Sequence, residues 1–376
     1  MSFPRATFSG EETMTEYAPY FYLDTSRFER VIALSDVHGD LNGFLSTLSK
    51  VGFNDKDALI IVGDILEKGE RALPLLRKVM EFASKGNVFM LMGNNDVIFS
   101  SWRDGTVSDE DMLKYLQNVP HSTVFEAGRE LGLGWDTLDE VTALRNAILE
   151  SFENEIAFLD SLPYIIETEF AVFVHAGLGD GPLCKQEPSV CLSAPEYGID
   201  KRRHDKPVIV GHWPASNYCT DIIRVDPYFN SETGVISIDG GNSLKSWGQI
   251  NYLIFKDGRL ETVGSYDELP KITVLEDQEE TKSPTLLIHP KTVLEILEPG
   301  ENESLCYLPF LGQKKLIPNR KIYEYRGKHY CYDYTDYKPG LFAGETVSLC
   351  QTDENGALIK KNGVVGCYTG KWKYVV

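Results

Sequence analysis

Six side chains that can bind a metal ion follow short apolar runs in this sequence, and glycines stand close to each of them. Carboxylate and amide oxygens combined with imidazole nitrogens form a ligand set that suits Mn, Fe or Zn better than Ca or Mg. The glycines let the backbone turn sharply beside a bound ion. The residue types therefore predict a metal site, and the candidate ligands are Asp36, His38, Asp64, Asn94, His175 and His212.

The apolar runs predict the strands that would position these ligands. They alternate with stretches in which apolar residues recur at helical spacing, a pattern typical of parallel βαβ units. In open α/β sheets, ligands bind at the carboxyl ends of the strands. We therefore expect the six side chains to converge at one edge of a sheet. The predicted strands lie at 31–34, 58–62, 88–92, 171–174, 208–210 and 235–238.

The rest of the chain divides into a helical stretch, a hairpin and a β-rich end. Residues 100–165 are predicted to be helical, with one continuous helical period from Val141 to Leu159. A hairpin is expected at 252–263, and the charged stretch 275–284 predicts a linker. Short β-prone pieces rich in Tyr, Val and Gly follow it. We expect an N-terminal lead-in at 1–29, a main α/β domain at 30–270 and a small β domain at 285–376.

The amino-acid composition limits the classes of function and partner that we expect. The 376 residues suggest about two domains. Lys and Arg total 37 against 56 for Asp and Glu, giving a net charge of −19. This acidity argues against a nucleic-acid polymer or a membrane surface as partner, but not against a small phosphorylated substrate held by metal ions. The sequence has no long apolar run and no recognisable signal peptide, and its seven cysteines are widely spaced. We therefore expect a cytoplasmic protein with reduced thiols.

The order and spacing of the polar motifs carry a family resemblance. Asp36 and Asp64 are 28 residues apart and Asp64 and Asn94 are 30 apart, or one βα unit in each case. Over roughly residues 30–265 the chain resembles the calcineurin-like metallophosphoesterases, and within them the serine/threonine phosphoprotein phosphatase branch. The motifs are DVHGD at 36–40, GDILEKG at 63–69, GNND at 93–96, HAGL at 175–178, GHW at 211–213 and ISIDGG at 236–241.

The resemblance implies a fold and a dinuclear metal centre. The implied fold is a four-layer α/β/β/α metallophosphoesterase sandwich, here followed by a small C-terminal all-β module. Two divalent ions, with manganese expected and iron or zinc as alternatives, would lie about 3.5–4 Å apart and share a hydroxide that attacks the phosphate. By this resemblance Asp36 and His38 bind the first ion, and Asp64 bridges both. The second ion is bound by Asn94, His175 and His212.

Three residues depart from the phosphatase pattern. Asn95 replaces the histidine that is the usual candidate for protonating the leaving oxygen, and an asparagine cannot act as a general acid near neutral pH. Glu67 and Lys68 replace the Asp that orients that histidine and the Arg that clamps phosphate. A lysine offers a point charge instead of a bidentate fork. The candidate catalytic residues are Asp64, Asn95, Glu67 and Lys68.

The preferred function is hydrolysis of a phosphate monoester, as in protein serine/threonine phosphatases. Pro214 favours this branch, since many phosphodiesterase relatives have a second metal-binding histidine there. Two alternatives remain. One is a phosphodiesterase or dinucleoside polyphosphate hydrolase, whose leaving group needs less protonation. The other is a non-catalytic metal-binding scaffold, suggested by the absent histidine.

The candidate substrate-binding residues are Lys68, Asn95, Arg203 and His204, and His204 is also a candidate proton donor. A solvated basic turn is the alternative for Arg203 and His204. The expected substrate is a phosphoprotein or a small phosphoester. The Tyr-rich stretch 323–337 suggests a protein partner at the β module, with packing inside the module as the alternative.

Overall fold

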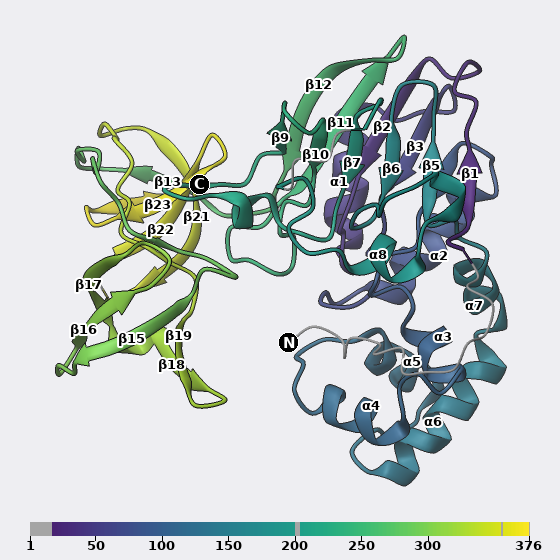
Figure 1. Cartoon of the computed structure of the whole chain (residues 1–376), viewed down its shortest axis with the longest axis horizontal. Helices are drawn as coiled ribbons and strands as arrows, with labels where there is room; N and C mark the ends of the chain where they lie inside the picture. Colours follow the sequence, from purple (N-terminus) through teal and green to yellow (C-terminus); the bar gives the residue numbers. More distant parts are fainter. Residues whose placement is uncertain (1–16, 200–203, 355, 376) are drawn as a thin grey trace. The chain divides into compact units, whose positions relative to one another are not determined.

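A computed structural model of the chain describes residues 17–199, 204–354 and 356–375, and these residues form two compact units (Figure 1). The first unit runs up to Pro214 and continues at Asp226–Glu268. The second consists of Ala215–Val225 and the chain from Leu269 onward. Among the residues described, no helix combines the length and the apolar character needed to span a bilayer.

The first unit contains two β-sheets. In one, β2, β3 and β4 are parallel and the hairpin β11–β12 pairs antiparallel beside β2, giving the order β12-β11-β2-β3-β4. The other has the order β1-β5-β6-β7-β10-β9. The strands are β1 (Tyr20–Tyr22), β2 (Arg30–Leu34), β3 (Asp57–Ile61), β4 (Val88–Met90), β5 (Ile165–Glu167), β6 (Val172–Val174), β7 (Val208–Val210), β9 (Tyr228–Asn230), β10 (Val235–Ser237), β11 (Ile250–Lys256) and β12 (Arg259–Tyr266).

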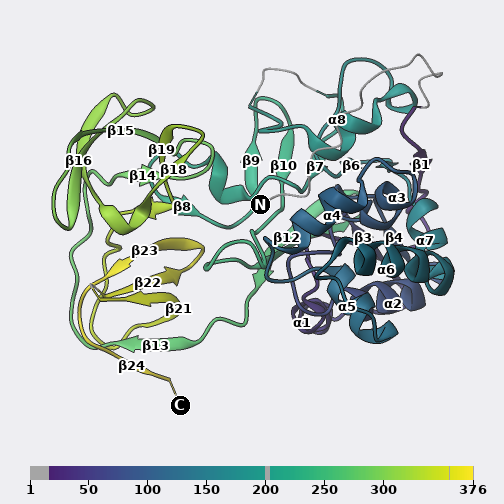
Figure 2. The same ribbon diagram turned by 90° about the horizontal axis from the view of Figure 1, so that it is seen from below.

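Alternate residues of the central strands enter different cores. Ile32 and Leu59 pack with the apolar faces of α1 (Leu41–Val51) and α2 (Ala72–Ala83). Their neighbours, such as Ala33 and Ile60, pack instead against Phe173, Ile209 and Leu253. The far face of the second sheet forms a third core that includes Cys191 of α8 (Pro188–Ser193). Figure 2 shows α8 apart from α1–α7. The period-2 alternation of the strands thus explains why both faces of the first sheet are covered.

Five helices lie between β4 and β5, in the stretch predicted to be helical. The helical period predicted from Val141 to Leu159 is shared by two helices, because α6 ends at Ser151 and α7 starts at Glu153. Phe152 is buried and stacks on Phe99 with ring centroids 6.5 Å apart. Phe152 therefore continues the apolar helical spacing across the break between α6 and α7. The helices are α3 (Ile98–Arg103), α4 (Asp109–Leu116), α5 (Thr123–Leu131), α6 (Leu138–Ser151) and α7 (Glu153–Asp160).

Two segments expected to be irregular are ordered by hydrogen bonds. β1 lies inside the predicted lead-in 1–29 and pairs in parallel with β5. This strand is short and its residues are exposed, so it shows no alternation. In the predicted linker 275–284, Gln278 exchanges backbone hydrogen bonds with Leu341, and its side chain donates to the carbonyls of Pro339 and Cys367. Shortness hid the pairing of β1, and polar composition hid that of Gln278.

The second unit is built from strands and short 3₁₀ turns in the part the structure describes. Its sheets have the orders β24-β13-β21-β22-β23-β8, β17-β16-β15-β19-β18 and β14-β20. The strands are β8 (Ile223–Arg224), β13 (Lys271–Val274), β14 (Leu286–Leu287), β15 (Val293–Glu298), β16 (Glu303–Leu308), β17 (Gln313–Pro318), β18 (Ile322–Tyr325), β19 (Lys328–Cys331), β20 (Tyr334–Thr335), β21 (Thr346–Asp353), β22 (Gly356–Lys361), β23 (Val364–Tyr368) and β24 (Trp372–Tyr374).

The tyrosines of β18 and β19 pack on one another. The Tyr323 ring lies 4.5 Å from that of Tyr332 and 5.6 Å from that of Tyr330, measured between centroids. Tyr325 and Tyr332 are nevertheless more than half exposed. Cross-strand packing therefore accounts for part of the aromatic stretch and leaves two rings at the surface.

Candidate functional site

The candidate ligands occupy loops that directly follow strands. Asp36 and His38 follow β2, Asp64 follows β3, Asn94 follows β4, and the two later histidines follow β6 and β7. Asp36, His38, Asp64 and His212 have positive φ values of 52°, 50°, 58° and 63°. Non-glycine residues in this region cost about 1–3 kcal/mol each and persist only where the surroundings hold them. The loops are therefore held in shape by their contacts.

Asp36, His38 and Asp64 form one tight, buried group. One ligand atom from each lies within 4.8 Å of the others. His38 Nε2 is 3.8 Å from both Asp36 Oδ1 and Asp64 Oδ2. Separations of this size leave room for an ion to contact all three at ordinary ligand distances of about 2.0–2.2 Å.

A second group shares Asp64. His175 Nε2 lies 3.5 Å from Asp64 Oδ1 and 3.0 Å from Asn94 Oδ1. His212 Nδ1 lies 2.7 Å from the same Asn94 oxygen. The structure thus brings all six candidate ligands together in two groups, and the Asp64 carboxylate faces both.

Backbone carbonyls fix the orientation of two of these histidines. His38 Nδ1 is 3.1 Å from the Leu66 carbonyl, and His175 Nδ1 is 2.9 Å from the Val62 carbonyl. A carbonyl only accepts, so each Nδ1 carries the hydrogen and donates. Each Nε2 then presents its lone pair to the carboxylates, which is how a metal-binding histidine is held.

Two buried carboxylates at the centre, Asp36 and Asp239, lack an adequate counter-charge from the protein. Burial, with the nearby charges of Asp239 and Asp64, raises the pKa of Asp36 well above its usual range. Burial likewise raises the pKa of Asp239 to about 7. The Oδ2 atom of Asp239 is buried and has no hydrogen-bond partner among the described residues. Since buried carboxylates are costly unless paired, bound cations would stabilise this cluster, and the donor set fits them.

Asp96 shapes the loop that carries Asp64. Its carboxylate accepts hydrogen bonds from the backbone nitrogens of Asp64, Ile65, Leu66 and Gly93 at 2.7–3.0 Å. Gly93 is packed so closely that a Cβ there would lie 2.2 Å from Asp64 Oδ1. The glycine is therefore required by contact with the shared ligand, and Asp96 orients that ligand without facing substrate.

Asn95 is committed to the shared aspartate. Its backbone nitrogen donates to Asp64 Oδ1 at 2.8 Å and its side-chain Nδ2 donates to Asp64 Oδ2 at 2.5 Å. Its buried Oδ1 has no hydrogen-bond partner among the described residues. Asn95 therefore holds Asp64 in place, and its amide supplies no titratable proton.

Glu67 lies in a different environment from the one expected from its position in the motif. Its buried carboxylate accepts hydrogen bonds from Tyr115 Oη at 2.5 Å, Ser122 Oγ at 3.1 Å and the Thr123 nitrogen at 2.7 Å. None of its described hydrogen bonds reaches Asn95. Burial and the Glu67 charge raise the pKa of Tyr115, so this hydroxyl stays protonated as a donor. Glu67 thus anchors the start of α5.

Lys68 supplies a cation beside the centre. The residue is half-buried, and burial lowers the pKa of its ammonium against the opposing charges of Glu67 and Asp64. It lies on the wall of a cavity of about 360 Å³ that also touches Gly39, next to the ligand His38. Arg71 and His121 line the same cavity. A phosphate bound at the metal ligands would therefore lie near the positively charged Lys68.

Of the remaining substrate-binding candidates, the structure describes His204. His204 Nε2 is 2.5 Å from the Tyr197 hydroxyl. Arg203 lies outside the described residues, so its predicted phosphate contact stays a prediction. Three other residues of the cavity wall were not expected from the sequence. Glu70 and Arg71 directly follow the 63–69 motif, and His121 comes from a separate loop that only folding brings beside them.

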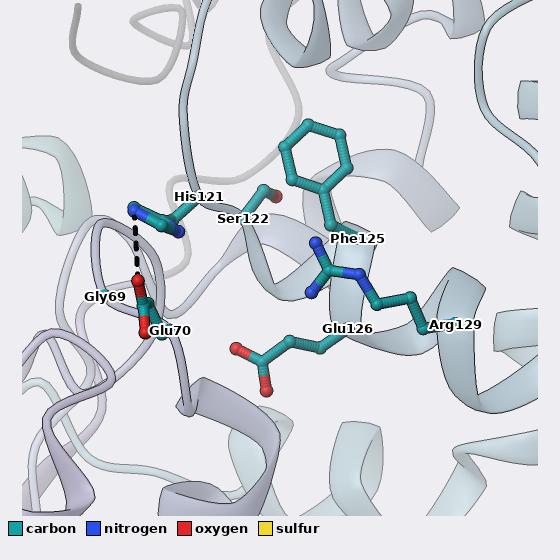
Figure 3. Close-up of a pocket in the computed structure, with 7 residues that line it drawn as sticks. All are labelled: Gly69, Glu70, His121, Ser122, Phe125, Glu126 and Arg129. Carbon is teal, nitrogen blue, oxygen red and sulfur yellow. Dashed lines mark ion pairs between the residues drawn. The ribbon is translucent and has the colours of Figure 1, made fainter.

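A second cavity of about 210 Å³ adjoins these residues. Gly69, Glu70 and His121 line both cavities. Figure 3 shows Glu70 and His121 facing each other, with Phe125, Glu126 and Arg129 projecting from α5. His121 Nε2 is 3.7 Å from Glu70 Oε1. The two cavities thus share a wall made of two titratable side chains.

Comparison with known proteins gives one match to a family and several to single proteins. The calcineurin-like phosphoesterase family model matches residues 29–221. A symmetrical bis(5'-nucleosyl)-tetraphosphatase from Nitrosomonas europaea is 34% identical over 79 residues, which are 21% of this chain and 29% of that protein. The match therefore spans less than a third of the relative.

Solved structures align over about two thirds of the chain. A metallophosphoesterase from Sphaerobacter thermophilus is 17% identical, with a TM-score of 0.39, covering 63% of this chain and 88% of its own. A protein serine/threonine phosphatase from Saccharomyces cerevisiae is 13% identical, with a TM-score of 0.40, covering 67% of this chain and 85% of its own.

Proposed function

The chain belongs to the calcineurin-like phosphoesterase family and is a hydrolase of phosphoesters, and we propose that it acts on a phosphate monoester at a centre of two divalent metal ions. The observation that carries this proposal is the meeting of both ligand groups at the Asp64 carboxylate. A single aspartate facing two sets of ligands suits a pair of neighbouring ions.

The residues divide into two ligand sets. Asp36 and His38 would hold one ion, and Asn94, His175 and His212 the other, with Asp64 common to both. When bound, such ions polarise the phosphate oxygens and provide a strong nucleophile at neutral pH. The donors suit manganese, iron or zinc, and we propose manganese. Lys68 would bind the phosphate through charge, since its ammonium lies beside the centre.

The fold supports the same proposal at a finer level. The first unit has two sheets with a shared core between them, helices α1 and α2 against one outer face and α8 against the other. We infer a four-layer α/β/β/α sandwich from these three cores. Its layers would hold the strand ends, and with them the ligands, at one edge.

A second candidate function is hydrolysis of a dinucleoside polyphosphate or of a phosphodiester. The observation that favours it is Asn95, which cannot protonate a leaving oxygen and is bound to Asp64. A nucleotide phosphate leaves readily without a proton. The local identity with a symmetrical tetraphosphatase adds support for this alternative.

We also propose a cytoplasmic location and a protein partner at the second unit. All seven cysteines are free thiols, as a reducing compartment would keep them.

The exposed rings of Tyr325 and Tyr332 are the surface that a phosphoprotein or other protein partner could contact.

The deciding experiment compares three substrates with added Mn²⁺: 4-nitrophenyl phosphate, bis(4-nitrophenyl) phosphate and diadenosine tetraphosphate. The proposal expects the monoester to have the highest kcat/KM. Preference for either of the other two would replace it with the second candidate. Inertness on all three, with two ions bound per chain, would instead support a metal-binding scaffold.

A further inference from the structure

The centre lacks a group that can protonate a leaving alcohol at the position where the family motif would place one. Asn95 occupies that position and donates to Asp64 through its backbone nitrogen and through its side-chain amide. A monoester of an alcohol leaves poorly as an alkoxide, so a positioned general acid is worth about 10²–10⁴-fold in rate. A side chain that supplies this proton must therefore lie elsewhere in the sequence.

Histidine is the side chain best suited to this task near neutral pH, and the chain has seven. Three belong to the ligand groups, and His204 contacts the Tyr197 hydroxyl. His289 and His329 belong to the second unit. His121 is the remaining one, and it lines the cavity that Lys68 and Gly39 also line.

The loop carrying the partner of His121 touches the ligand loop directly. The backbone of Gly69 packs so closely on His38 that a Cβ there would lie 2.0 Å from the His38 carbonyl oxygen. The Arg71 nitrogen donates to the Gly39 carbonyl at 3.1 Å. Glu70 lies between Gly69 and Arg71, and its Oε1 is 3.7 Å from His121 Nε2. The carboxylate thus connects His121 to the loop of a metal ligand.

Glu67 fixes His121 from the other side. Its carboxylate accepts hydrogen bonds from Ser122 Oγ and the Thr123 nitrogen, which directly follow His121 in the chain. The residue expected to orient a proton donor at position 95 therefore anchors the segment that carries a different one. With Nε2 facing Glu70, the other ring nitrogen of His121 has no hydrogen-bond partner among the described residues and is available to a ligand.

We propose that His121 is the catalytic general acid and that Glu70 is a positioning residue for its ring. This inference rests on the proposed monoesterase function. As water adds to phosphorus, the bond from phosphorus to the ester oxygen breaks and its electron pair stays on that oxygen. The oxygen takes the proton from the His121 imidazolium, so the alcohol leaves neutral. The imidazole then takes a proton from solvent.

Other charged groups share these walls. Asp40, Lys68 and Arg71 line the larger cavity with His121, and Glu126 and Arg129 line the smaller one. The test therefore varies the leaving group, because only a proton donor changes the dependence of rate on the acidity of the leaving alcohol. A group that merely binds phosphate affects all esters alike.

The experiment measures kcat/KM of full-length wild type and His121→Ala on phenyl phosphate and on 4-nitrophenyl phosphate. The variant should lose about 10²–10⁴-fold on phenyl phosphate and less than about 10-fold on 4-nitrophenyl phosphate, whose phenolate needs little protonation. Glu70→Ala should show the same bias in weaker form. His329→Ala, in the second unit, is the matched control and should leave both rates unchanged.

Equal losses on the two esters, or no loss, would overturn the assignment of His121. Lack of turnover by the wild type on both esters would refute the proposed monoesterase function itself, so the two failures are distinguishable. The midpoint of urea unfolding and the Mn²⁺ stoichiometry of His121→Ala should match the wild type. A lower value of either, together with equal losses, would mark the residue as structural.

Discussion

Asn95 donates to both oxygens of the Asp64 carboxylate, through its backbone nitrogen to Oδ1 and through its side-chain amide to Oδ2. The two residues stand at the ends of neighbouring parallel strands, β3 and β4. This pairing fixes the one carboxylate that faces both ligand groups. It also means that the side chain at position 95 serves the metal centre and not the leaving group.

Asp64→Asn should abolish turnover and reduce bound Mn²⁺ from two ions to at most one per chain. The substitution removes the charge shared by both ligand groups and places an amide against the Nδ2 of Asn95. Equilibrium titration with Mn²⁺ and the phosphatase assay test this together. Asp55→Asn, at an exposed turn, is the control. Full activity of Asp64→Asn would contradict the shared-ligand assignment.

Asn95→His should restore activity to a chain that lacks His121. The double variant His121→Ala/Asn95→His is expected to hydrolyse phenyl phosphate at least about 10-fold faster than His121→Ala alone, because it regains a general acid. The new imidazole must give up the Asn95 side-chain hydrogen bond to Asp64, so recovery should be partial. The measurement is steady-state kcat/KM on phenyl phosphate. A double variant no faster than His121→Ala would show that lack of a proton donor does not limit the rate of His121→Ala.

Glu67→Ala should lower the free energy of unfolding by at least about 2 kcal/mol, since each buried polar group left without a partner costs about 1–3 kcal/mol. Tyr115, Ser122 and the Thr123 nitrogen would all lose their acceptor. Urea unfolding measures the change. Glu150→Ala, on an exposed position of α6, should stay within about 0.5 kcal/mol of wild type. Similar values for the two variants would refute the anchoring role.

Gly93→Ala should weaken Mn²⁺ binding, because its Cβ would lie 2.2 Å from Asp64 Oδ1 and 2.3 Å from the Asp64 nitrogen. Gly179→Ala is the matched control, as its nearest contact would be 3.4 Å from Gln186 Oε1. Calorimetric titration should show at least about a 10-fold weaker affinity for the first variant, in line with mutations that misplace groups supporting metal ligands. Unchanged affinity would mean that the loop moves to accept a methyl group.

Thiol reactivity should follow burial. Burial raises the pKa of Cys191 and of Cys331 to about 12, so very little of either is thiolate at pH 8. Cys184 is exposed and open to reagent. Mass spectrometry after alkylation with iodoacetamide should find Cys184 labelled and the other two labelled only in urea. Equal labelling of all three in the native protein would contradict the packing around α8 and β19.

The strands and the ligands could be predicted because both follow simple rules. The predicted strand over 208–210 is confirmed as β7. The one at 31–34 differs from β2 by one residue at its start, and the one at 58–62 differs from β3 by one residue at each end. A buried parallel strand appears in sequence as an unbroken apolar run. Because carboxyl ends of neighbouring strands share an edge, residues such as Asp36 and Asp64 could be expected to meet.

The place of His121 in the cavity wall could not be predicted, because it lies far along the chain from the motifs that supply Gly39, Lys68 and Gly69. Glu67 and Lys68 have φ values of 63° and 69°, a conformation that a sequence pattern does not reveal for a glutamate or a lysine. That backbone turns Glu67 toward α4 and α5 and away from position 95. The motif identified Glu67 as functional but could not say what it contacts. His121 lies in the loop between α4 and α5, and no sequence motif indicates that it is functional.

The second unit is made of two separate segments of the chain, which restricts how it can be removed. Residues 215–225 leave the first unit three positions after His212 and contribute β8, which pairs with β23 near the C-terminal end of the chain. A stop codon after Glu268 would therefore leave β8 without its neighbour inside an otherwise continuous first unit. End-to-end joining of two genes would not produce this connectivity. A truncated first unit therefore needs a bridge from Pro214 to Asp226 as well as a new end.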